Sequence, residues 1–586
     1  MHNIESLISS KIKDVVEIDP RDANTPDNWI PRHPEMVRLT GKHPFNAEAP
    51  LPLLLDQGFI TPAPLHYVRN HGPVPKLSWE THRLIVDGLV KKPLNLSMDD
   101  IATLPYIEFP LTMVCAGNRR KEQNMIKQTI GFNWGPAAVS NAIWKGVRLS
   151  HVLELAGAKF DPTQPRYVCF EGVDKLPNGV YGTSLPIEWV MNEANDIILA
   201  YEMNGEKLTP DHGFPIRTIL PGYIGGRTIK WLGKVSISDK ESDSFYHFRD
   251  NRVLPPEYDA ERATKENIWY NPNYIIYKLN INSAIAAPAH DEKIMMSKLA
   301  SNSEYTVKGY AYIGNGTKCI RVEISLDYGK TWLLTNLTQP EPEFPLVKNR
   351  GMNPLPRYWC WTFWELSIPL HSLIRCGEIS VRAWDSNQNT QPRDPTWNVM
   401  GMMNNCHYKV LVHPFVENDE FGLIFEHPTQ PGTIPGGWMV KKEAPKKEAK
   451  VEEKPKTPAP SNEKIFTMNQ VSKHNNEKDC WIVVANKVYD ATSFLKDHPG
   501  GKAAILINAG TDVTDEFNDI HSEKAKVKLN EFYVGDLASR LKPGTSRDFS
   551  DENLDETLEA NKENLLTALT SGTIINEVVM VSQDDV

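Results

Sequence analysis

The chain has 586 residues, of which 40% are apolar and 24% are charged, and its formal net charge is −10. This length is too great for one hydrophobic core, so several domains are expected. The acidic balance argues against broad binding to a nucleic acid. No run of about 18 apolar residues occurs, so the sequence predicts no membrane span.

Cysteine usage and the N-terminus bear on the compartment. The seven cysteines are scattered, their number is odd and no CxxC pair occurs. This pattern argues against a disulfide framework and favours a reducing compartment. The N-terminus has no basic segment followed by an apolar stretch, so no signal peptide is predicted. We therefore expect a cytoplasmic location.

The first chemically informative segment surrounds Cys115. Two small residues follow this cysteine, and three consecutive cations occupy 119–121. Neighbouring cations lower the pKa of a thiol and favour the thiolate that attacks carbon or binds a metal. Arginine can also hold an oxyanion with two parallel hydrogen bonds. The pattern indicates a metal-bound or reactive thiolate beside an oxyanion pocket. The alternative is an inert buried cysteine followed by a basic surface turn.

The middle of the chain changes in character. Residues 36–260 are a Pro- and Gly-rich mixture of short strands and helices, whereas strand signals dominate between about 263 and 435. Apolar residues alternate over 320–326, and a turn at 327–330 precedes 331–334, so we expect a hairpin with one buried face. Another such strand is predicted at 379–384. Several short strands separated by turns predict an antiparallel sandwich.

Two segments of the C-terminal part cannot form a core. Residues 441–460 are mostly charged residues, alanine and proline. This composition predicts a semi-extended tether. A linker-like segment near 541 leads into an acidic tail with leucines at helical spacing. We expect this tail to be a frayed helix rather than a docked one.

Between these segments, His498 lies in the sequence DHPGG at 497–501. Proline and glycine fix a tight turn after the histidine and expose its imidazole. A second histidine, His521, follows a helical-looking stretch at 512–518. Two neutral imidazoles on opposite faces of a flat macrocycle would saturate its iron, which suits electron transfer rather than O₂ binding. Alternatives are two surface histidines or a zinc site, although no other Cys or His lies at zinc spacing.

Several segments together resemble one family. The sequence CAGNRRKEQN at 115–124, continuing to GFNWG at 131–135, resembles the molybdenum-ligand segment of eukaryotic assimilatory nitrate reductases, relatives of the sulfite oxidases. Segments that resemble the family's cofactor-binding stretches follow in the family's order: YVRNH at 67–71, DHGFPIR at 211–217 and GRTIKW at 226–231. Residues 425–439 resemble the end of its dimerisation domain, and 463–537 resemble cytochrome b5.

This resemblance implies roles for individual residues. Cys115 would be the protein thiolate on molybdenum, whose other sulfurs come from a pterin dithiolene. Nitrate would be clamped by Arg120 and Arg69, with Trp134 as a wall and Asn251 as a neutral donor. His498 and His521 would be the axial ligands of heme b. The residues implied in pterin binding are Arg69, Asn70, His71, Cys115, Asp174, His212, Arg217, Thr228, Ile229 and Lys230.

Met400 bears on the choice of substrate. It lies in TWNVMGMMNN at 396–405, which resembles a nitrate reductase segment, whereas sulfite oxidases carry an arginine at this position. Loss of one positive charge suits a monoanion better than a dianion, because the attraction scales with the product of the charges. Met400 therefore favours nitrate, unless it only packs in a core.

The implied function is reduction of nitrate to nitrite by oxygen-atom transfer at a molybdenum–molybdopterin centre, with electrons delivered by a b-type heme. The alternatives are a sulfite oxidase that passes electrons out through the heme, and a heme-only electron carrier. No flavin site is detected and no Gly-x-Gly-x-x-Gly follows a predicted strand, so we expect a separate flavin or nicotinamide reductase, or another donor. The resemblance also implies a homodimer.

The expected fold class is multidomain α+β. It combines a sulfite-oxidase-type mixed α/β molybdopterin domain, an immunoglobulin-like β-sandwich dimerisation domain and a small α+β cytochrome b5-like domain. The predicted division is an N-terminal extension (1–35), the molybdopterin domain (36–262), the sandwich (263–440), a flexible linker (441–462), the heme domain (463–540) and an acidic tail (541–586).

Overall fold

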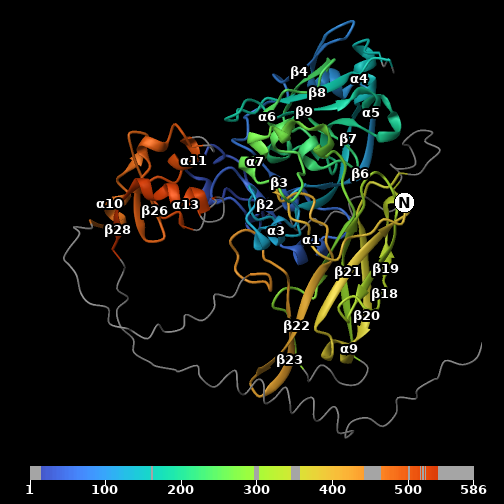
Figure 1. Cartoon of the computed structure of the whole chain (residues 1–586). Coiled ribbons are helices and arrows are strands. Elements are labelled where there is room, and N and C mark those ends of the chain that lie inside the picture. Colours follow the sequence, from blue (N-terminus) through green and yellow to red (C-terminus); the bar gives the residue numbers. More distant parts are fainter. Residues whose placement is uncertain are drawn as a thin grey trace, which may run out of the picture.

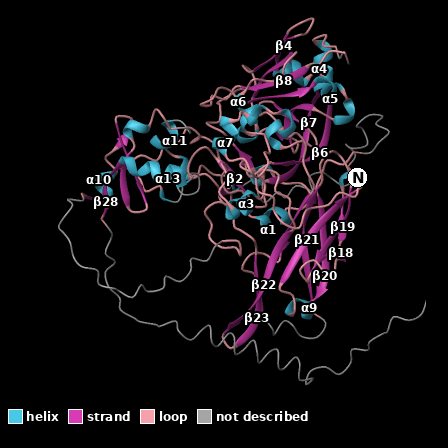
Figure 2. Ribbon diagram, viewed as in Figure 1, coloured by secondary structure: helices cyan, strands magenta, loops and turns pink. Residues whose placement is uncertain are grey.

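The structure is a computed structural model (Figures 1 and 2). It describes residues 15–159, 161, 163–295, 303–344, 357–440, 464–498, 502–514, 517, 521 and 523–538. The predicted linker and acidic tail lie outside the described residues, as do the proline and two glycines of the DHPGG sequence and residues 515, 516 and 518 of the stretch at 512–518. Within the described ranges, no helix has the length and apolar character needed to cross a bilayer.

A small sheet near the N-terminus joins the first residues to the rest of the fold. Its order is β1 (Val37–Arg38), β2 (Asn46–Glu48) and β3 (Val68–Arg69), and both pairings are antiparallel. Asn46 lies opposite Arg69 in this register. The N-terminal segment (residues 15–48) thus supplies β2, the strand that pairs with β3 and so positions Arg69, one of the predicted nitrate-binding cations.

Two five-stranded sheets form the body of the N-terminal α/β domain. The first contains β11 (Glu206–Lys207), β10 (Ile198–Met203), β7 (Val139–Arg148) and β6 (Tyr106–Val114), and β12 (Arg217–Ile219) also pairs with β10. The second has the order β5 (Leu94–Ser97), β4 (Arg83–Gly88), β13 (Leu232–Ser238), β8 (Tyr167–Gly172) and β9 (Gly182–Pro186). Only β4 and β13 pair in parallel among these strands, so the domain is mixed as predicted.

Short helices lie between the strands of this domain along the chain. The side chain of Ser97 accepts a hydrogen bond from the Asp100 amide, and this capping box starts α2. The helices are α1 (Leu51–Asp56), α2 (Met98–Ala102), α3 (Arg120–Ile126), α4 (Leu149–Leu155), α5 (Ile187–Met191), α6 (Phe245–Arg249) and α7 (Ala260–Lys265).

The next domain is an antiparallel sandwich, in agreement with the prediction. One sheet has the order β14 (Asn282–Ala287), β16 (Glu304–Tyr312), β20 (Thr362–Pro369) and β19 (Asn336–Thr338). The other has the order β15 (Lys293–Met295), β23 (Glu420–Glu426), β22 (Tyr408–Glu417), β21 (Glu378–Asp385), β17 (Cys319–Ser325) and β18 (Leu333–Leu334). Helix α9 (Leu370–Ile374) follows β20 directly.

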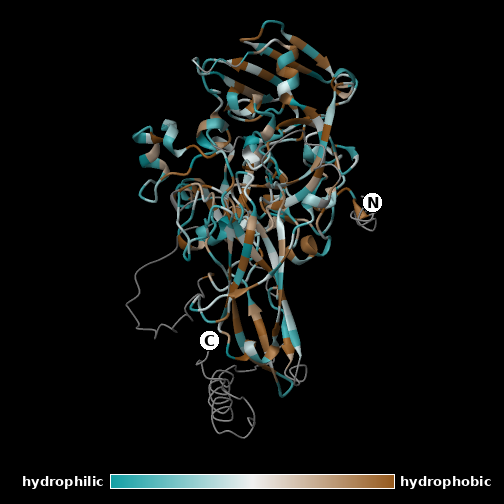
Figure 3. Cartoon of the chain, turned by 90° about the vertical axis from the view of Figure 1, so that its right-hand side faces the viewer, coloured by the Kyte–Doolittle hydropathy of each residue, from teal (hydrophilic) through white to brown (hydrophobic). Residues whose placement is uncertain are grey.

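The predicted hairpin of the sandwich is confirmed. Ile324 of β17 lies opposite Leu333 of β18. Val322 and Ile324 are fully buried, whereas Ile320 is 39% exposed. Hydrophobic residues recur along the strands of the sandwich in Figure 3. One hydrophobic cluster joins Ala47 of β2, Val139 of β7 and the sandwich strands, so the N-terminal segment and both domains share a core.

The C-terminal domain (orange to red in Figure 1) is a small α+β unit. Its sheet has the order β24 (Ile465–Phe466), β28 (Tyr533–Leu537), β27 (Lys487–Asp490), β26 (Asp479–Val484) and β25 (Asn475–Asn476). The parallel pairing of β24 with β28 brings the two ends of the domain together. The described helices are α10 (Met468–Val471), α11 (Lys502–Leu506) and α13 (Glu523–Leu529).

Candidate functional site

A cavity of about 200 Å³ opens in the N-terminal α/β domain, where loops from several strands meet. It is bounded by the loop after β6, the loop after β3 and the segments before and after β12. The methionine-rich loop that follows β21 closes it from the sandwich side. The predicted site residues that line it are Arg69, His71, Cys115, Arg120, Asp174, His212, Arg217, Thr228, Lys230, Asn251 and Met400.

Three predicted residues do not line this cavity. Trp134 is fully buried, and its ring centroid lies 5.4 Å from that of Phe132. Phe132 itself forms the wall, so the prediction that Trp134 does so is wrong, because the larger indole is absorbed into the core behind it. Ile229 is a core residue. Asn70 lies behind the cavity, where its side chain supports residues that line it.

Cys115 follows the last residue of β6. Its Sγ accepts a hydrogen bond from the Gly117 amide (3.4 Å), and its own amide donates to the Ala138 carbonyl (2.9 Å). Burial raises the pKa of the Cys115 thiol, although the charges of Arg120 and Arg69 act to lower it. The neighbouring cations therefore act on this pKa in the expected direction, but desolvation outweighs them and the net shift is upward. A metal ion bound to Sγ would itself remove the proton.

The three consecutive cations after Cys115 point in different directions. Arg119 has a left-handed backbone (φ 65°) and a fully buried side chain, which pairs with Glu122 (2.8 Å) and donates to the Cys406 carbonyl (2.7 Å). The Nζ of Lys121 donates to the Gly432 carbonyl (2.7 Å) on the sandwich side. Only Arg120 of the three lines the cavity. The basic cluster is therefore mostly a domain contact.

Arg120 and Arg69 both lie against the ring of Phe132 in the cavity wall. Their Cζ atoms lie 5.8 and 5.2 Å from the centroid of its ring. The Nε of Arg120 donates to the Met400 carbonyl (3.0 Å) and Nη1 to the Phe132 carbonyl (3.3 Å), while Nη2 has no hydrogen-bond partner among the described residues. Burial lowers the pKa of Arg120 to about 10, so the guanidinium stays charged at neutral pH.

Glycines make the space that the Arg120 side chain occupies. A Cβ atom at Gly117 would lie 2.6 Å from Nη2 of Arg120, and one at Gly131 would lie 2.5 Å from its Cζ. Gly401, with φ +59°, would place a Cβ 2.6 Å from Cγ of Arg120. The small residue Gly117, two positions after Cys115, thus leaves room for the Arg120 side chain.

At its deep end, the cavity carries polar atoms that lack a protein partner. The Nε2 atoms of His212 and His66 and the Nε of Arg217 are buried without a hydrogen bond to any described residue. Burial lowers the pKa of His212 to about 3 and that of Lys230 to about 7. Unused donors and acceptors beside buried cations fit an anionic, hydrogen-bonding heterocycle such as a phosphorylated pterin.

Other lining residues complete the polar surface. His71 donates from Nε2 to Asp250 (2.7 Å); burial lowers the pKa of this histidine to about 4, so the imidazole is neutral beside the carboxylate. The side-chain amide of Asn251 donates to the Tyr246 carbonyl (3.1 Å). Burial raises the pKa of Asp174.

Sequence reasoning missed several lining residues. His66 precedes a segment that carried the resemblance and Asp250 precedes the predicted Asn251, but neither has a pattern of its own. The lining residues that were not predicted include His66, Phe132, Tyr181, Asp211, Asp250 and Met402. Asp211 lies inside the recognised segment at 211–217, and adjacency to a predicted residue is the signal that could have found His66 and Asp250.

In the C-terminal domain, the two predicted heme ligands face each other. The ring centroids of His498 and His521 lie 5.9 Å apart. Two imidazole nitrogens that are each about 2 Å from one metal ion place their ring centroids roughly 6 Å apart, so the pair fits a single iron. His521 Nδ1 lies 3.1 Å from the Phe517 carbonyl, a contact that selects the tautomer with Nε2 free to bind metal. Burial lowers the pKa of His521, which favours the neutral ligand form.

The surroundings of these histidines are apolar. The Phe517 ring stacks on His521 with centroids 4.2 Å apart, and Phe494 lies 5.9 Å from His498. A hydrophobic cluster that includes Ile482 and Val513 continues this surface. An apolar pocket with two opposed imidazoles fits a flat macrocycle with a six-coordinate iron.

The chain matches three domain families. They are an oxidoreductase molybdopterin binding domain over residues 71–246, a Mo-co oxidoreductase dimerisation domain over 273–415, and a cytochrome b5-like heme/steroid binding domain over 467–538. These matches confirm the predicted fold class. They also confirm the predicted cofactor domains.

Relatives match along most of the chain. Nitrate reductase (NADH) 2 of Nicotiana tabacum is 52% identical over 531 residues, which cover 89% of this chain and 58% of that protein. Nitrate reductase (NADH) of Petunia hybrida is 50% identical over 558 residues, which cover 92% of this chain and 60% of that protein. This chain spans about three-fifths of the length of these relatives. Among solved structures, the sulfane dehydrogenase SoxCD from Paracoccus pantotrophus is 23% identical and covers 67% of this chain and 90% of its own, with a TM-score of 0.49.

Proposed function

Because this chain is nitrate reductase-like, with a molybdopterin domain, a dimerisation domain and a cytochrome b5-like heme domain, we propose that it reduces nitrate to nitrite. The observation that carries this proposal is the pair of guanidinium groups beside Cys115. Arg69 and Arg120 line one cavity with this thiol, and Nη2 of Arg120 has no hydrogen-bond partner among the described residues. A planar oxyanion needs such convergent cationic donors.

The side chains around this point define the substrate pocket. Arg69 and Arg120 would bind and orient the anion, and Asn251 would supply a neutral donor. The side chains of Phe132 and Met400 keep the remaining wall apolar and exclude water, which strengthens the electrostatic contacts inside. A methionine where sulfite oxidases carry an arginine leaves one positive charge fewer, and this suits a monoanion. The pocket therefore favours nitrate over sulfite.

Other residues would hold the cofactors. When bound, the molybdenum–pterin group supplies two-electron oxygen-atom-transfer chemistry. Cys115 would anchor the metal. His71, Asp174, His212, Arg217, Thr228 and Lys230 would contact the pterin from the remaining walls of the cavity. The unpaired Nε2 of His212 and Nε of Arg217 support this assignment. In the C-terminal domain, His498 and His521 would hold the heme iron, so that the heme delivers electrons one at a time.

The assembly and the electron supply follow from the same assignment. We propose a homodimer formed through the dimerisation domain. We also propose that a flavin- or nicotinamide-dependent reductase, or another donor, reduces the heme. We also propose a cytoplasmic location, which the scattered and odd-numbered cysteines of the sequence support.

Transient heme spectroscopy tests the proposed function. The heme of the purified protein is reduced chemically, excess reductant is removed and nitrate is added. We expect prompt reoxidation of the heme with one nitrite formed for every two electrons that the reduced protein loses, because nitrate reduction consumes two electrons. If sulfite instead reduces the oxidised heme, the protein is a sulfite oxidase. If the purified protein contains iron but no molybdenum, it is a heme-only carrier.

A further inference from the structure

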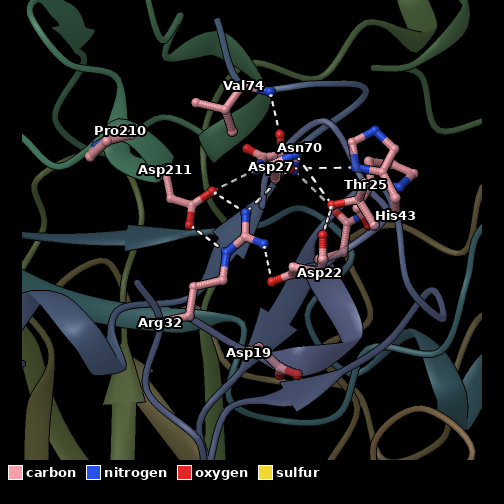
Figure 4. A network of polar contacts seen from close by, with 12 residues as sticks. Asp19, Asp22, Thr25, Asp27, Arg32, His43, Asn70, Val74, Pro210 and Asp211 are labelled. Carbon is pink, nitrogen blue, oxygen red and sulfur yellow. Dashed lines mark hydrogen bonds and ion pairs between the residues drawn. The ribbon is translucent and has the colours of Figure 1, made fainter. Parts of the chain in front are cut away.

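A buried network of charges joins the N-terminal segment to the wall of the cavity (Figure 4). At its centre is Arg32, whose side chain is only 4% exposed. Its guanidinium donates to Asp22 (2.8 Å), Asp27 (3.2 Å) and both carboxylate oxygens of Asp211 (2.9 and 3.0 Å). Asp22 and Asp27 belong to the same N-terminal segment as Arg32, whereas Asp211 lines the cavity.

The contacts continue from Asp211 to a cation of the cavity. Oδ1 of Asp211 also accepts from the side-chain amide of Asn70 (2.9 Å). Lys230 donates from Nζ to Oδ1 of Asn70 and to the main-chain carbonyl of Asp211 (2.8 Å). A continuous set of hydrogen bonds therefore runs from Arg32 through Asp211 and Asn70 to the ammonium group of Lys230, which lines the cavity.

The charges show what Arg32 contributes. It is the one cation among the described residues that donates to both oxygens of Asp211. Without it, the carboxylate of Asp211 would lose its counter-charge in the interior, where an unpaired charge is strongly unfavourable. Lys230 already donates to the main-chain carbonyl of Asp211, so the carboxylate would turn toward that ammonium group. Lys230 would then face Asp211 instead of a bound anion.

We propose that Arg32 is a positioning residue for the pterin cavity. It holds the Asp211 carboxylate in place, so that Asp211 and Asn70 keep the Lys230 ammonium group directed at the cofactor. The proposal rests on the proposed function, in which this cavity binds the pterin. The N-terminal segment then belongs to the cofactor site, although the molybdopterin family match begins only at residue 71. The β2–β3 pairing gives this segment a second role, since Asn46 Oδ1 accepts from the amide of Asn70 (2.9 Å).

The chain contains a matched control for this proposal. Arg38 also lies in the N-terminal segment, and its side chain is 6% exposed. Both arginines lie against the ring of Phe45, with Cζ 3.8 Å from its centroid for Arg32 and 4.8 Å for Arg38. Arg38 pairs with Asp19 (3.0 Å) and Asp22 (2.7 Å) but makes no contact with Asp211. Removal of either arginine disturbs the segment, and only removal of Arg32 releases the cavity carboxylate.

The experiment compares Arg32→Met and Arg38→Met in the full chain with its cofactors. Two quantities are measured: molybdenum per heme after purification, and the rate constant of pterin release, followed by the fluorescence of the released, oxidised pterin. We expect Arg32→Met to release pterin at least about tenfold faster than the wild type, as loss of one partner of a buried pair mainly raises a dissociation rate. The release rate of Arg38→Met is expected to stay within about twofold of the wild type, because Arg38 does not belong to the pair formed by Arg32 and Asp211.

Two further variants test the proposal even if Arg32→Met does not fold. Arg32→Lys keeps the charge but loses the two-point contact, so we expect an intermediate release rate. In an Asp211→Asn background, replacement of Arg32 by Lys should change the rate less than in the wild type, because the effect passes through that carboxylate.

Equal release rates for Arg32→Met and Arg38→Met would overturn the proposal, as would an Arg32→Lys effect that is independent of Asp211. A wild-type protein that contains heme but no pterin or molybdenum would instead overturn the proposed function, and this inference with it.

Discussion

Glu48, the last residue of β2, is a fully buried carboxyl group, and the replacement Glu48→Gln tests the consequence of that burial. Its Oε1 accepts a hydrogen bond from the Gly135 amide (3.0 Å). Burial raises the pKa of Glu48 from 4.5 to about 8, although the Gly135 amide and the charge of Lys121 act to lower it. Glutamine keeps the acceptor for Gly135 and cannot ionise.

The sign of the pH dependence follows from this raised pKa. Between pH 4.5 and about 8, Glu48 has lost its proton in the unfolded chain and keeps it in the folded protein. The unfolded state then binds fewer protons, so wild-type stability falls as the pH rises through this window and is level on either side of it. The slope is about 1.4 kcal/mol per pH unit, which is roughly 3–6 °C in Tm per pH unit for a domain of this size.

Differential scanning calorimetry at one scan rate from pH 5 to pH 8.5 measures this effect. The difference in Tm between Glu48→Gln and the wild type should be small at pH 5 and should increase up to about pH 8. The exposed Glu80, replaced by Gln, is the control, and its difference should not vary with pH. A difference for Glu48→Gln that is constant or decreases with pH would refute the reasoning, because Glu48 would then be ionised in the folded protein.

Three more predictions concern the proposed sites. Arg120→Lys should lower kcat/KM for nitrate about a hundredfold to a thousandfold, because lysine cannot donate to the carbonyls of Met400, Gly401 and Phe132 and still present a donor to the anion. Activity close to the wild type with a reduced artificial donor would contradict the role of Arg120 in binding nitrate. Gly131→Ala should lower kcat/KM about a hundredfold, since the added Cβ displaces the Arg120 guanidinium; a crystal structure with this side chain unmoved would show that the crowding argument fails. His521→Ala should remove the optical spectrum of a six-coordinate heme and abolish heme-dependent nitrate reduction. A donor that reduces molybdenum directly should still support turnover in this variant, and an unaltered heme spectrum would exclude His521 as a ligand.

The candidate sites were predictable where neighbouring residues in the chain supply the chemistry. The segment that begins with Cys115 and the sequence DHPGG around His498 each indicate a metal ligand from a few adjacent residues. The alternating strands of the sandwich were predictable for the same reason, since a buried face depends on a local period of two residues. The structure brings Arg69, Cys115 and Arg120 to one cavity. Arg69 comes from the segment at 67–71, whereas Cys115 and Arg120 come from the segment at 115–124.

The orientation of side chains was not predictable to the same degree. Arg120 and Lys121 are neighbours on α3, and a helix turns by about 100° per residue, so adjacent cations face different surroundings. The sequence also contained no signal that distinguished Phe132 from Trp134 as the cavity wall. That choice depends on which ring the core can absorb, and the core includes residues from distant strands.

The sequence by itself determined the types of domain in this protein and the identity of its main candidate ligands, because these depend on residue types at short spacing. The tertiary structure alone decided which cations reach the cavity, that burial raises the pKa of Cys115, and that Arg32 pairs with Asp211 across 179 positions of the chain. The physical reason is that desolvation and ion pairing depend on the distances between atoms after packing, and no local pattern records those distances.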